Sequence, residues 1–245
     1  MKFVAKTDVG KKRKNNEDSY YAKNLGNDVE LYIVADGLGG YEGGEIASKV
    51  LVEKISSYIE SNKKRLGTLS HEKVMSVIKM GLLIANEEIY KLEKTSEKYK
   101  GMGTTVVLVL KVKEDIYYLS VGDSRIYYIN NKCDKIEQVT VDDTYVNELI
   151  KTNVIKEEEA VNHPQKHVLT KAVGILKNIS AEVSLLNIKE GYIMLCSDGV
   201  TNMLTEENIL HIFKRNKFEN LADKIVEQAN ANGGLDNITT IIIHL

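Results

Sequence analysis

The sequence is short of the residues that support several common classes of protein. Its 245 residues include two cysteines, one proline and no tryptophan. No Cys-x-x-Cys or Cys/His spacing indicates a zinc site. Cys196 lies inside an apolar run, where a free thiol behaves as a small hydrophobic group. This use of cysteine favours a reducing compartment.

Long apolar runs and a strong charge of either sign are absent as well. No run is long enough to cross a bilayer, and the first six residues lack the apolar core of a signal peptide. The formal net charge of −2 gives no general attraction to nucleic acid or to an anionic membrane. The short basic stretch at 11–14 is typical of a solvated turn. We expect a cytoplasmic protein that binds neither nucleic acid nor membranes, and we expect a monomer.

No linker rich in proline, glycine or serine divides the chain, so we expect one domain over residues 1–245. Helical patterns come in two pairs, at 42–61 with 70–99 and at 206–215 with 219–231, and each pair can cover one sheet. Short turns between strand patterns favour antiparallel pairing. The prediction is an α+β fold, a four-layer α-β-β-α sandwich of two antiparallel sheets flanked by helix pairs. The strands are expected at 2–8, 18–24, 29–35, 104–112, 115–122, 125–130, 135–140, 180–188, 192–197 and 237–244.

A more polar segment at 141–178 interrupts the run of strands. It is expected to contain two short helices, and it carries His163 and His167. We expect a flap over one edge of the sandwich, because excursions of this kind often contact substrate. Either histidine is a candidate for protonating a leaving group.

Four aspartates border strand patterns. Asp36, Asp123 and Asp198 each close an apolar run, and Asp236 opens the final one. An Asp-Gly pair, as at Asp36 and Asp198, is by itself a common turn. Both pairs here, however, are followed by helical patterns and not by partner strands. Rigid strand ends hold carboxylates in fixed directions, and hard cations such as Mg²⁺ or Mn²⁺ relieve their repulsion. The pattern predicts a divalent-cation site.

A glycine-rich loop at 37–44 lies between a strand and a helix, which is where nucleotide-binding loops occur. The dinucleotide pattern requires glycine at position 42, where Glu42 stands. The P-loop requires lysine after its last glycine, but Glu45 follows Gly44. We interpret the glycines as allowing the backbone to approach a metal cluster, with the Gly37 carbonyl as a candidate ligand.

An N-terminal segment offers a cation beside two acids. Arg13 precedes Glu17 and Asp18 where a turn leads into a strand. A guanidinium group can bind two phosphate oxygens at once. Glu17 and Asp18 can hold metal-bound waters or pair with Arg13. Alone, such a segment is more often a surface turn.

In chain order, these segments resemble the metal-dependent Ser/Thr protein phosphatases of the PPM family, or protein phosphatase 2C type, in their compact bacterial form. The resemblance covers nearly the whole chain. Each motif is weak alone, and the set in sequence carries the resemblance. The motifs are TDVGKKRKNNED at 7–18, VADGLGG at 34–40, GMGTT at 101–105, VGDSR at 121–125, LTKAVG at 169–174, SDG at 197–199 and DNIT at 236–239.

The resemblance implies the same α-β-β-α sandwich, with two Mn²⁺ or Mg²⁺ ions in a cleft at one end. Asp36 would bridge both ions, and the Gly37 carbonyl would bind the first. Asp198 and Asp236 would bind the second. Asp123, with Asp198, resembles a third, weaker metal site of bacterial members.

The resemblance also implies an activity. Arg13 would hold the substrate phosphate, while Glu17 and Asp18 would act mainly through water. The expected reaction is hydrolysis of phosphoserine and phosphothreonine in proteins by a metal-activated water. Phosphorylated proteins, including a bacterial Ser/Thr kinase, are the implied partners. The alternative is an inactive regulatory or binding module on the same fold, which predicts the loss of one or more metal carboxylates.

Three positions depart from the family pattern. Leu38 stands where many eukaryotic members have a histidine, so a histidine general acid is absent there. Asp143 and Lys171 stand where bacterial relatives often have histidine and arginine. Both of these lie in the flap and bear on substrate preference.

Overall fold

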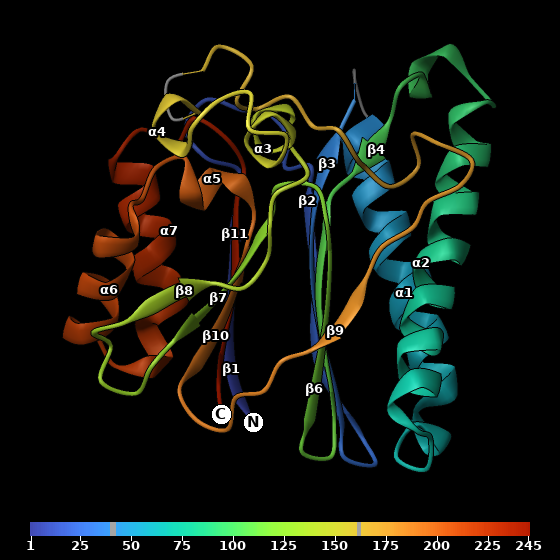
Figure 1. Cartoon of the computed structure of the whole chain (residues 1–245), viewed down its shortest axis with the longest axis horizontal. Helices are drawn as coiled ribbons and strands as arrows, with labels where there is room; N and C mark the ends of the chain where they lie inside the picture. The colour runs from blue at the N-terminus through green and yellow to red at the C-terminus, as the bar shows by residue number, and fades with distance from the viewer. Residues whose placement is uncertain (40–42, 161–162) are drawn as a thin grey trace.

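The computed structural model of the protein describes residues 1–39, 43–160 and 163–245. Within these residues, two antiparallel sheets stack face to face, and a pair of helices covers the outer face of each (Figure 1). The α+β class and the four-layer α-β-β-α order predicted from the sequence are therefore confirmed. None of the described helices is both long and apolar enough to cross a lipid bilayer.

The first sheet, called here the β11 sheet, brings the two ends of the chain together. Its strand order is β1-β11-β10-β7-β8, and each neighbouring pair is antiparallel. Strand β11 thus lies between strands from the N-terminal and central parts of the chain. The bounds are β1 Lys2–Asp8, β7 Arg125–Ile129, β8 Ile136–Gln138, β10 Tyr192–Cys196 and β11 Ile238–His244.

The second sheet, called here the β3 sheet, follows the order β2-β3-β5-β6-β9 and is also antiparallel. A two-residue strand, β4, pairs with the end of β3. The bounds are β2 Asp18–Gly26, β3 Val29–Leu38, β4 Gly103–Thr104, β5 Val106–Val112, β6 Asp115–Val121 and β9 Val183–Leu185.

Helices α1 and α2 pack on the β3 sheet, and helices α6 and α7 pack on the β11 sheet (Figure 1). Shorter helices lie in the flap, after β10 and at two connections. The long helices are α1 Gly43–Leu66, α2 His71–Glu93, α6 Glu206–Arg215 and α7 Leu221–Ala231. The short ones are η1 Glu97–Tyr99, α3 Tyr145–Lys151, α4 Glu157–Ala160, α5 Asp198–Thr201 and η2 Phe218–Asn220.

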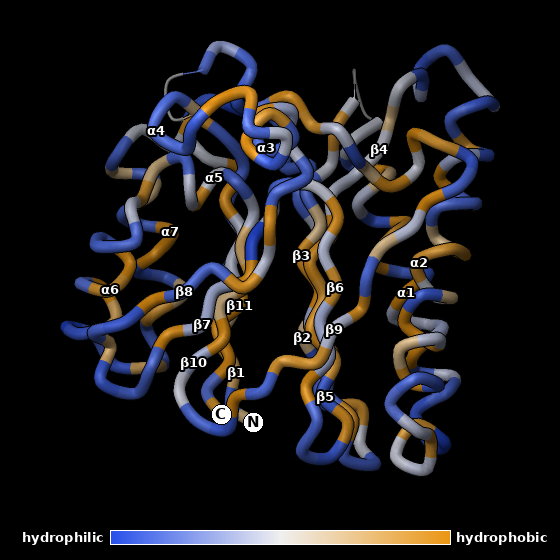
Figure 2. Tube along the Cα trace, in the orientation of Figure 1, coloured by the Kyte–Doolittle hydropathy of each residue, from blue (hydrophilic) through white to orange (hydrophobic). Residues whose placement is uncertain are grey.

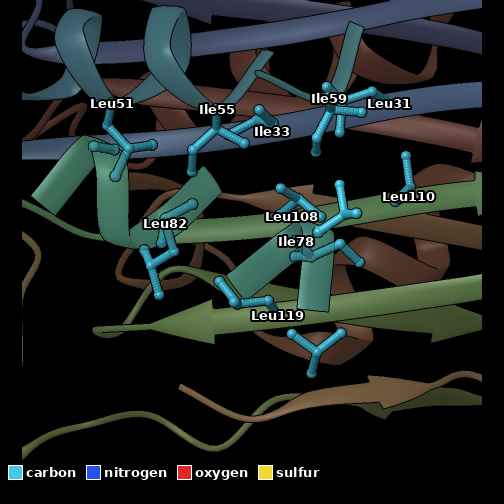
Figure 3. Close-up of a cluster of buried hydrophobic side chains, with 14 of the residues drawn as sticks. Leu31, Ile33, Leu51, Ile55, Ile59, Ile78, Leu82, Leu108, Leu110 and Leu119 are labelled. Carbon is cyan, nitrogen blue, oxygen red and sulfur yellow. The ribbon is translucent and has the colours of Figure 1, made fainter. Parts of the chain in front are cut away.

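Strand β3 shows how the layers are built. Leu31 and Ile33 face α1 and α2, while Tyr32 and Val34 face the other sheet. The strand is apolar on both faces because each face is covered, and each such side chain contributes about 1.5–3 kcal/mol on burial. Figure 2 shows hydrophobic residues along the strands of both sheets, and Figure 3 shows leucine and isoleucine side chains of α1 and α2 gathered over β3, β5 and β6.

The helix boundaries differ from the prediction at several points. The helix expected at 42–61 continues to Leu66, and its expected start at residue 42 lies outside the described residues. The helix expected at 70–99 ends at Glu93, and only a short turn, η1, follows. Ser70 has an N-cap backbone conformation, but its side chain makes no capping hydrogen bond with any described residue. Thr205, in contrast, forms a complete capping box with Asn208 at the start of α6.

Two expected strands are shorter than their apolar patterns. The run at 104–112 is interrupted at Thr105, and the run at 180–188 forms a strand only at Val183–Leu185. Residues 130–132 lie within the connection between β7 and β8. Hydrogen bonds to neighbouring segments determine where these strands begin and end, and the apolar pattern of the sequence does not record those bonds.

The flap predicted at 141–178 carries the helices α3 and α4 at one end of the sandwich (Figure 1). Asp143 fastens it to the framework. Its backbone N–H donates to the carbonyl of Gly122 at 2.9 Å, and its carboxylate accepts from the Gly122 N–H at 3.1 Å. Its carbonyl accepts from the Thr170 N–H at 2.9 Å. This flap residue therefore holds the loop that carries Asp123.

Candidate functional site

A cleft of about 480 Å³ opens at the flap end of the sandwich, with walls from both sheets. It collects most of the residues singled out in the sequence. Of the predicted site residues, Arg13, Glu17, Asp36, Gly37, Asp123, Asp198 and Asp236 line it.

Asp36 is held from the β3 sheet by its own backbone. Its N–H donates to the Thr105 hydroxyl at 3.0 Å, and its carbonyl accepts from the Thr105 N–H at 2.8 Å. The hydroxyl of Thr104 donates to the same carbonyl at 2.9 Å. The interruption between β4 and β5 therefore serves to fix the position of Asp36.

Two glycines allow three segments to meet beside Asp36. A Cβ atom on Gly37 would collide with the carbonyl oxygen of Gly44. One on Gly44 would collide with the Glu17 carboxylate. The Gly37 N–H donates to the Glu17 carbonyl at 3.1 Å. The glycines thus permit close approach between these backbone segments, and the approach of the loop to a metal cluster stays a prediction. Residues 40–42 of the loop lie outside the described part of the chain.

Asp198 and Asp236 come from adjacent strands of the β11 sheet. Asp198 follows β10 and begins α5, whereas Asp236 precedes β11, so that antiparallel pairing places both at one end of the sheet. The side-chain amide of Asn202 donates to Asp198 at 2.9 Å. The strand order therefore brings Asp198 and Asp236 to the same end of the β11 sheet.

Arg13 lies at the rim of the cleft with a different partner from the one considered in the sequence. Its Nη2 donates to a carboxylate oxygen of Asp236 at 2.8 Å, and its side chain is 53% exposed. Burial acts to lower the pKa of Arg13, but the charge and hydrogen bond of Asp236 outweigh it and raise that pKa. The guanidinium therefore stays charged where a phosphate could enter.

Asp18 is buried behind the cleft and does not line it. It lies opposite Asp36 in the pairing of β2 with β3, and one carboxylate oxygen accepts from the Ser197 hydroxyl at 2.7 Å. The other oxygen has no hydrogen-bond partner among the described residues. Burial first, and then the charges of Asp198 and Asp236, raise the pKa of Asp18 to about 7.

The same two causes act on the acids that line the cleft. Burial, followed by the charges of neighbouring aspartates, raises the pKa of Asp36 well above its ordinary value and raises that of Asp198. The pKa of Asp123 rises to about 7 through burial and the charges of Asp198 and Asp142. Burial also raises the pKa of Glu17. Negative charge is thus concentrated without enough protein cations to balance it.

The donor set fits a hard divalent cation. It consists of carboxylate and carbonyl oxygens, which Mg²⁺ and Mn²⁺ prefer, and oxygens of Asp18 and Asp198 lack hydrogen-bond partners among the described residues. A cation would also remove the repulsion that raises these pKa values. Within residues 1–39, 43–160 and 163–245, no three His, Cys, Asp or Glu side chains already form a ready-made metal site.

Asn237 is a functional residue to which the sequence analysis gave no role of its own. Its side-chain oxygen Oδ1 accepts from the Glu17 N–H at 2.8 Å, and its side-chain Nδ2 donates to the backbone carbonyls of Val9 and Asn15, each at 2.9 Å. The residue preceding β11 thereby fixes the loop that carries Arg13. The only local signal was its place after Asp236, because its partners are more than 200 positions away in the chain.

The two flap histidines differ. His167 lines the cleft, whereas His163 lies beside the Tyr145 ring, with ring centroids 6.2 Å apart. His163 also accepts a hydrogen bond from the Gln165 N–H at 3.2 Å. Only His167 is placed where it could meet a bound substrate.

A sequence model described as "Protein phosphatase 2C" matches residues 10–238. The protein phosphatase PhpP of Streptococcus pneumoniae is 34% identical, over 100% of this chain and 98% of that protein. Among solved structures, the S. agalactiae serine/threonine phosphatase has a TM-score of 0.91 and 32% identity, covering 100% of this chain and 99% of that one. The catalytic domain of the phosphatase PstP, solved with two manganese ions, has a TM-score of 0.82 and 26% identity, covering 98% and 96%.

Proposed function

The chain belongs to the protein phosphatase 2C family, and on this premise we propose that it hydrolyses phosphoserine and phosphothreonine in proteins. The observation that carries the proposal is the cluster of Asp36, Asp198 and Asp236 in one open cleft with the Arg13 guanidinium at its rim. All four aspartates expected of an active member are in place, which opposes an inactive module. In this proposal residues 1–245 act as one catalytic domain.

Two Mn²⁺ or Mg²⁺ ions are proposed for the cleft. Asp36 and the Gly37 carbonyl would hold the first, and Asp36 would bridge to the second. Asp198 and Asp236 would complete the second site, while Asp123 and Asp198 would serve a third, weaker one. When bound, the ions supply the activation of a water molecule and balance negative charge on the phosphoryl group.

The chain's own residues position the substrate and these ligands. Arg13 is proposed to bind the phosphate, because a planar guanidinium can hold two phosphoryl oxygens together. Glu17 and Asp18 act through water or through the packing of the cleft. Thr105 and Asn202 hold Asp36 and Asp198, so that the carboxylates are oriented before substrate arrives.

In the proposed reaction the attacking water gives up one proton and its oxygen forms a bond to phosphorus, while the bond from phosphorus to the serine or threonine oxygen breaks. That oxygen takes a proton, which gives free hydroxyl and inorganic phosphate. Leu38 cannot supply the proton. His167 lines the cleft and is the flap residue in a position to do so.

The substrates are proposed to be cytoplasmic proteins that a bacterial Ser/Thr kinase has phosphorylated, with the kinase among them. Cys133 and Cys196 are both buried free thiols, which suits a reducing compartment. A monomer is proposed as the working form.

The direct test is hydrolysis of p-nitrophenyl phosphate and of a phosphothreonine peptide by the purified protein. Activity is expected with Mn²⁺, less with Mg²⁺ and none in excess EDTA, with recovery when Mn²⁺ is restored. Undiminished turnover in EDTA would overturn the metal assignment. Failure to release phosphate from either substrate with any divalent cation would overturn the proposed function.

A further inference from the structure

A second hollow, called here the side groove, lies next to the cleft and has a different chemistry. Its volume is about 420 Å³, and leucine and isoleucine side chains form much of its wall. Lys171 contributes a cationic side chain at the same place. The apolar lining of the side groove includes Leu38, Leu169, Ile175, Leu176 and Ile179.

Two side chains of the side groove are exposed although they are large and apolar. Leu176 is 65% exposed and Ile175 is 40% exposed. Single exposed leucines are common on protein surfaces. Ile175 and Leu176, in contrast, are neighbours in a concave surface next to a cleft. Apolar side chains gathered in this way are typical of a binding site.

The backbone that carries these side chains is held in place. The buried Asn86 of α2 donates to the carbonyls of Leu176 at 3.0 Å and of Lys177 at 3.1 Å. The side-chain oxygen Oδ1 of Asn86 accepts from the Gly174 N–H at 2.8 Å. Val173 also bridges to Thr104. The hydrogen bonds of the buried Asn86 therefore fix the backbone that exposes Ile175 and Leu176, and we call them the Asn86 clamp.

The side groove is continuous with the cleft. Leu38 and Leu169 line both hollows, so one side of each residue borders the acidic site and the other borders the apolar groove. Leu38 ends β3, two residues after Asp36, and it pairs with Gly103 of β4. A polypeptide whose phosphorylated side chain enters the cleft would pass directly over these two leucines.

From this continuity we propose that the side groove binds the polypeptide chain of the substrate, taking apolar side chains that flank the phosphorylated residue on one side. The proposal rests on the proposed function and deepens it by naming a substrate class: phosphoproteins with leucine-like residues beside the phosphorylated position. Lys171 adds a preference against a basic residue in that flank, because like charges would then face each other across the groove.

The test compares matched phosphothreonine peptides with p-nitrophenyl phosphate. The peptides carry Leu or Ser at the flanking positions, on either the N-terminal or the C-terminal side. The variants are Leu176→Ser and Ile175→Ser, because neither residue lines the cleft. Leu83→Ser is the control, since Leu83 of α2 is also exposed, at 43%, but does not line the groove.

For the wild type, kcat/KM is expected to be about 5–10-fold higher for the Leu peptides on one side only, as for loss of a modest apolar contact. Leu176→Ser and Ile175→Ser should remove this preference, mainly through KM. They should leave p-nitrophenyl phosphate and the Ser peptides within about twofold of the wild-type rate. Leu83→Ser should change none of these values.

The outcomes separate this proposal from the proposed function. If wild type and variants hydrolyse all peptides equally, the side groove does not bind substrate, while the phosphatase assignment stands. If the preference persists in both variants, another surface reads the peptide, and the proposal fails. If Leu176→Ser instead changes the sedimentation of the protein or its binding to lipid vesicles, with no effect on peptides, the groove serves a second copy or a membrane. Absence of phosphate release from every substrate counts against the proposed function.

Discussion

Two buried acids in the β3 sheet show opposite ways of placing a carboxylate in a protein interior. Glu30, near the start of β3, is 5% exposed, and its carboxylate accepts a hydrogen bond from the Tyr32 hydroxyl at 2.6 Å. The amino group of Met1 lies 2.8 Å from it, and Lys111 Nζ lies 3.8 Å from it. Asp18, opposite the far end of β3, is 7% exposed, is surrounded by other acids and has one oxygen without a partner among the described residues.

The contrast distinguishes a structural acid from an acid that awaits a ligand. A buried carboxylate is tolerated when donors and cations surround it, as at Glu30. Burial and the charges of neighbouring acids raise the pKa values of Asp18 and Asp36, while the Arg13 guanidinium donates its hydrogen bond to Asp236. The fold therefore accepts local instability at one end of the strand. A divalent cation would remove the cause of that instability.

The largest expected effect comes from replacing a carboxylate by an amide, first among the acids of the cleft and then at Glu30. Asp198→Asn and Asp236→Asn should each lower kcat by at least ~10²-fold, because the proposed second ion activates the attacking water. Their fold should survive, since like-charge repulsion is relieved. Glu30→Gln should keep kcat but lower the free energy of unfolding by about 1–3 kcal/mol, because it weakens a satisfied buried network. Steady-state kinetics at limiting Mn²⁺ and urea unfolding measure the two effects. Wild-type rates in both aspartate variants would refute the assignment.

A smaller effect is expected at Arg13, the cation that borders the acidic end. Arg13→Ala should cost about 2 kcal/mol in kcat/KM, or ~30-fold, which is below the range for a buried donor because the side chain is half exposed. Arg13→Lys should raise KM more than it lowers kcat, because it keeps the charge and loses the planar fork. Calorimetry without substrate should show little change in Mn²⁺ affinity. An unchanged kcat/KM in Arg13→Ala would leave Arg13 as a surface residue.

The smallest expected effect concerns stability and pH in the metal-free protein. The pKa of Asp18 rises from 3.8 to about 7 on folding, so the folded state holds a proton that the unfolded state releases between these values. Its contribution is thus fully present below about pH 4 and is lost as pH rises through 7. We expect this group to lower the unfolding free energy by about 1–2 kcal/mol between pH 5 and pH 8 in EDTA.

Asp18→Asn should remove the share of that pH dependence that Asp18 contributes, because an amide does not titrate. The part that comes from the raised pKa values of Asp36, Asp123 and Asp198 should remain. Asp28→Asn is the matched control, since Asp28 is an exposed carboxyl at the turn between β2 and β3. Urea unfolding in EDTA at both pH values measures the difference. The interpretation would be contradicted if the unfolding free energy of the wild type rose from pH 5 to pH 8 and that of Asp18→Asn rose equally. The negative charges around Asp18 would then be balanced within the protein.

Much of this arrangement follows from local patterns. The nearly continuous apolar run of β3 and the apolar stripes of α1 and α2 extend over many residues, so the layers were predictable. The four aspartates were found because each borders a strand. The partner of Arg13 was not predictable, since Asp236 is 223 positions away. The interruption at Thr105 and the clamp at Asn86 likewise depend on hydrogen bonds between distant segments, which no local pattern records.

The position of β11 has a consequence for biosynthesis. Asn237 holds the loop of Arg13, the Gly234 carbonyl accepts from the N–H groups of Lys11 and Lys12, and β11 separates β1 from β10. A nascent chain still lacking β11 has β1 without its neighbour and the loop of Arg13 without its anchor. Such a chain is unable to assemble the cleft, which forms only once the strand between β1 and β10 has emerged from the ribosome.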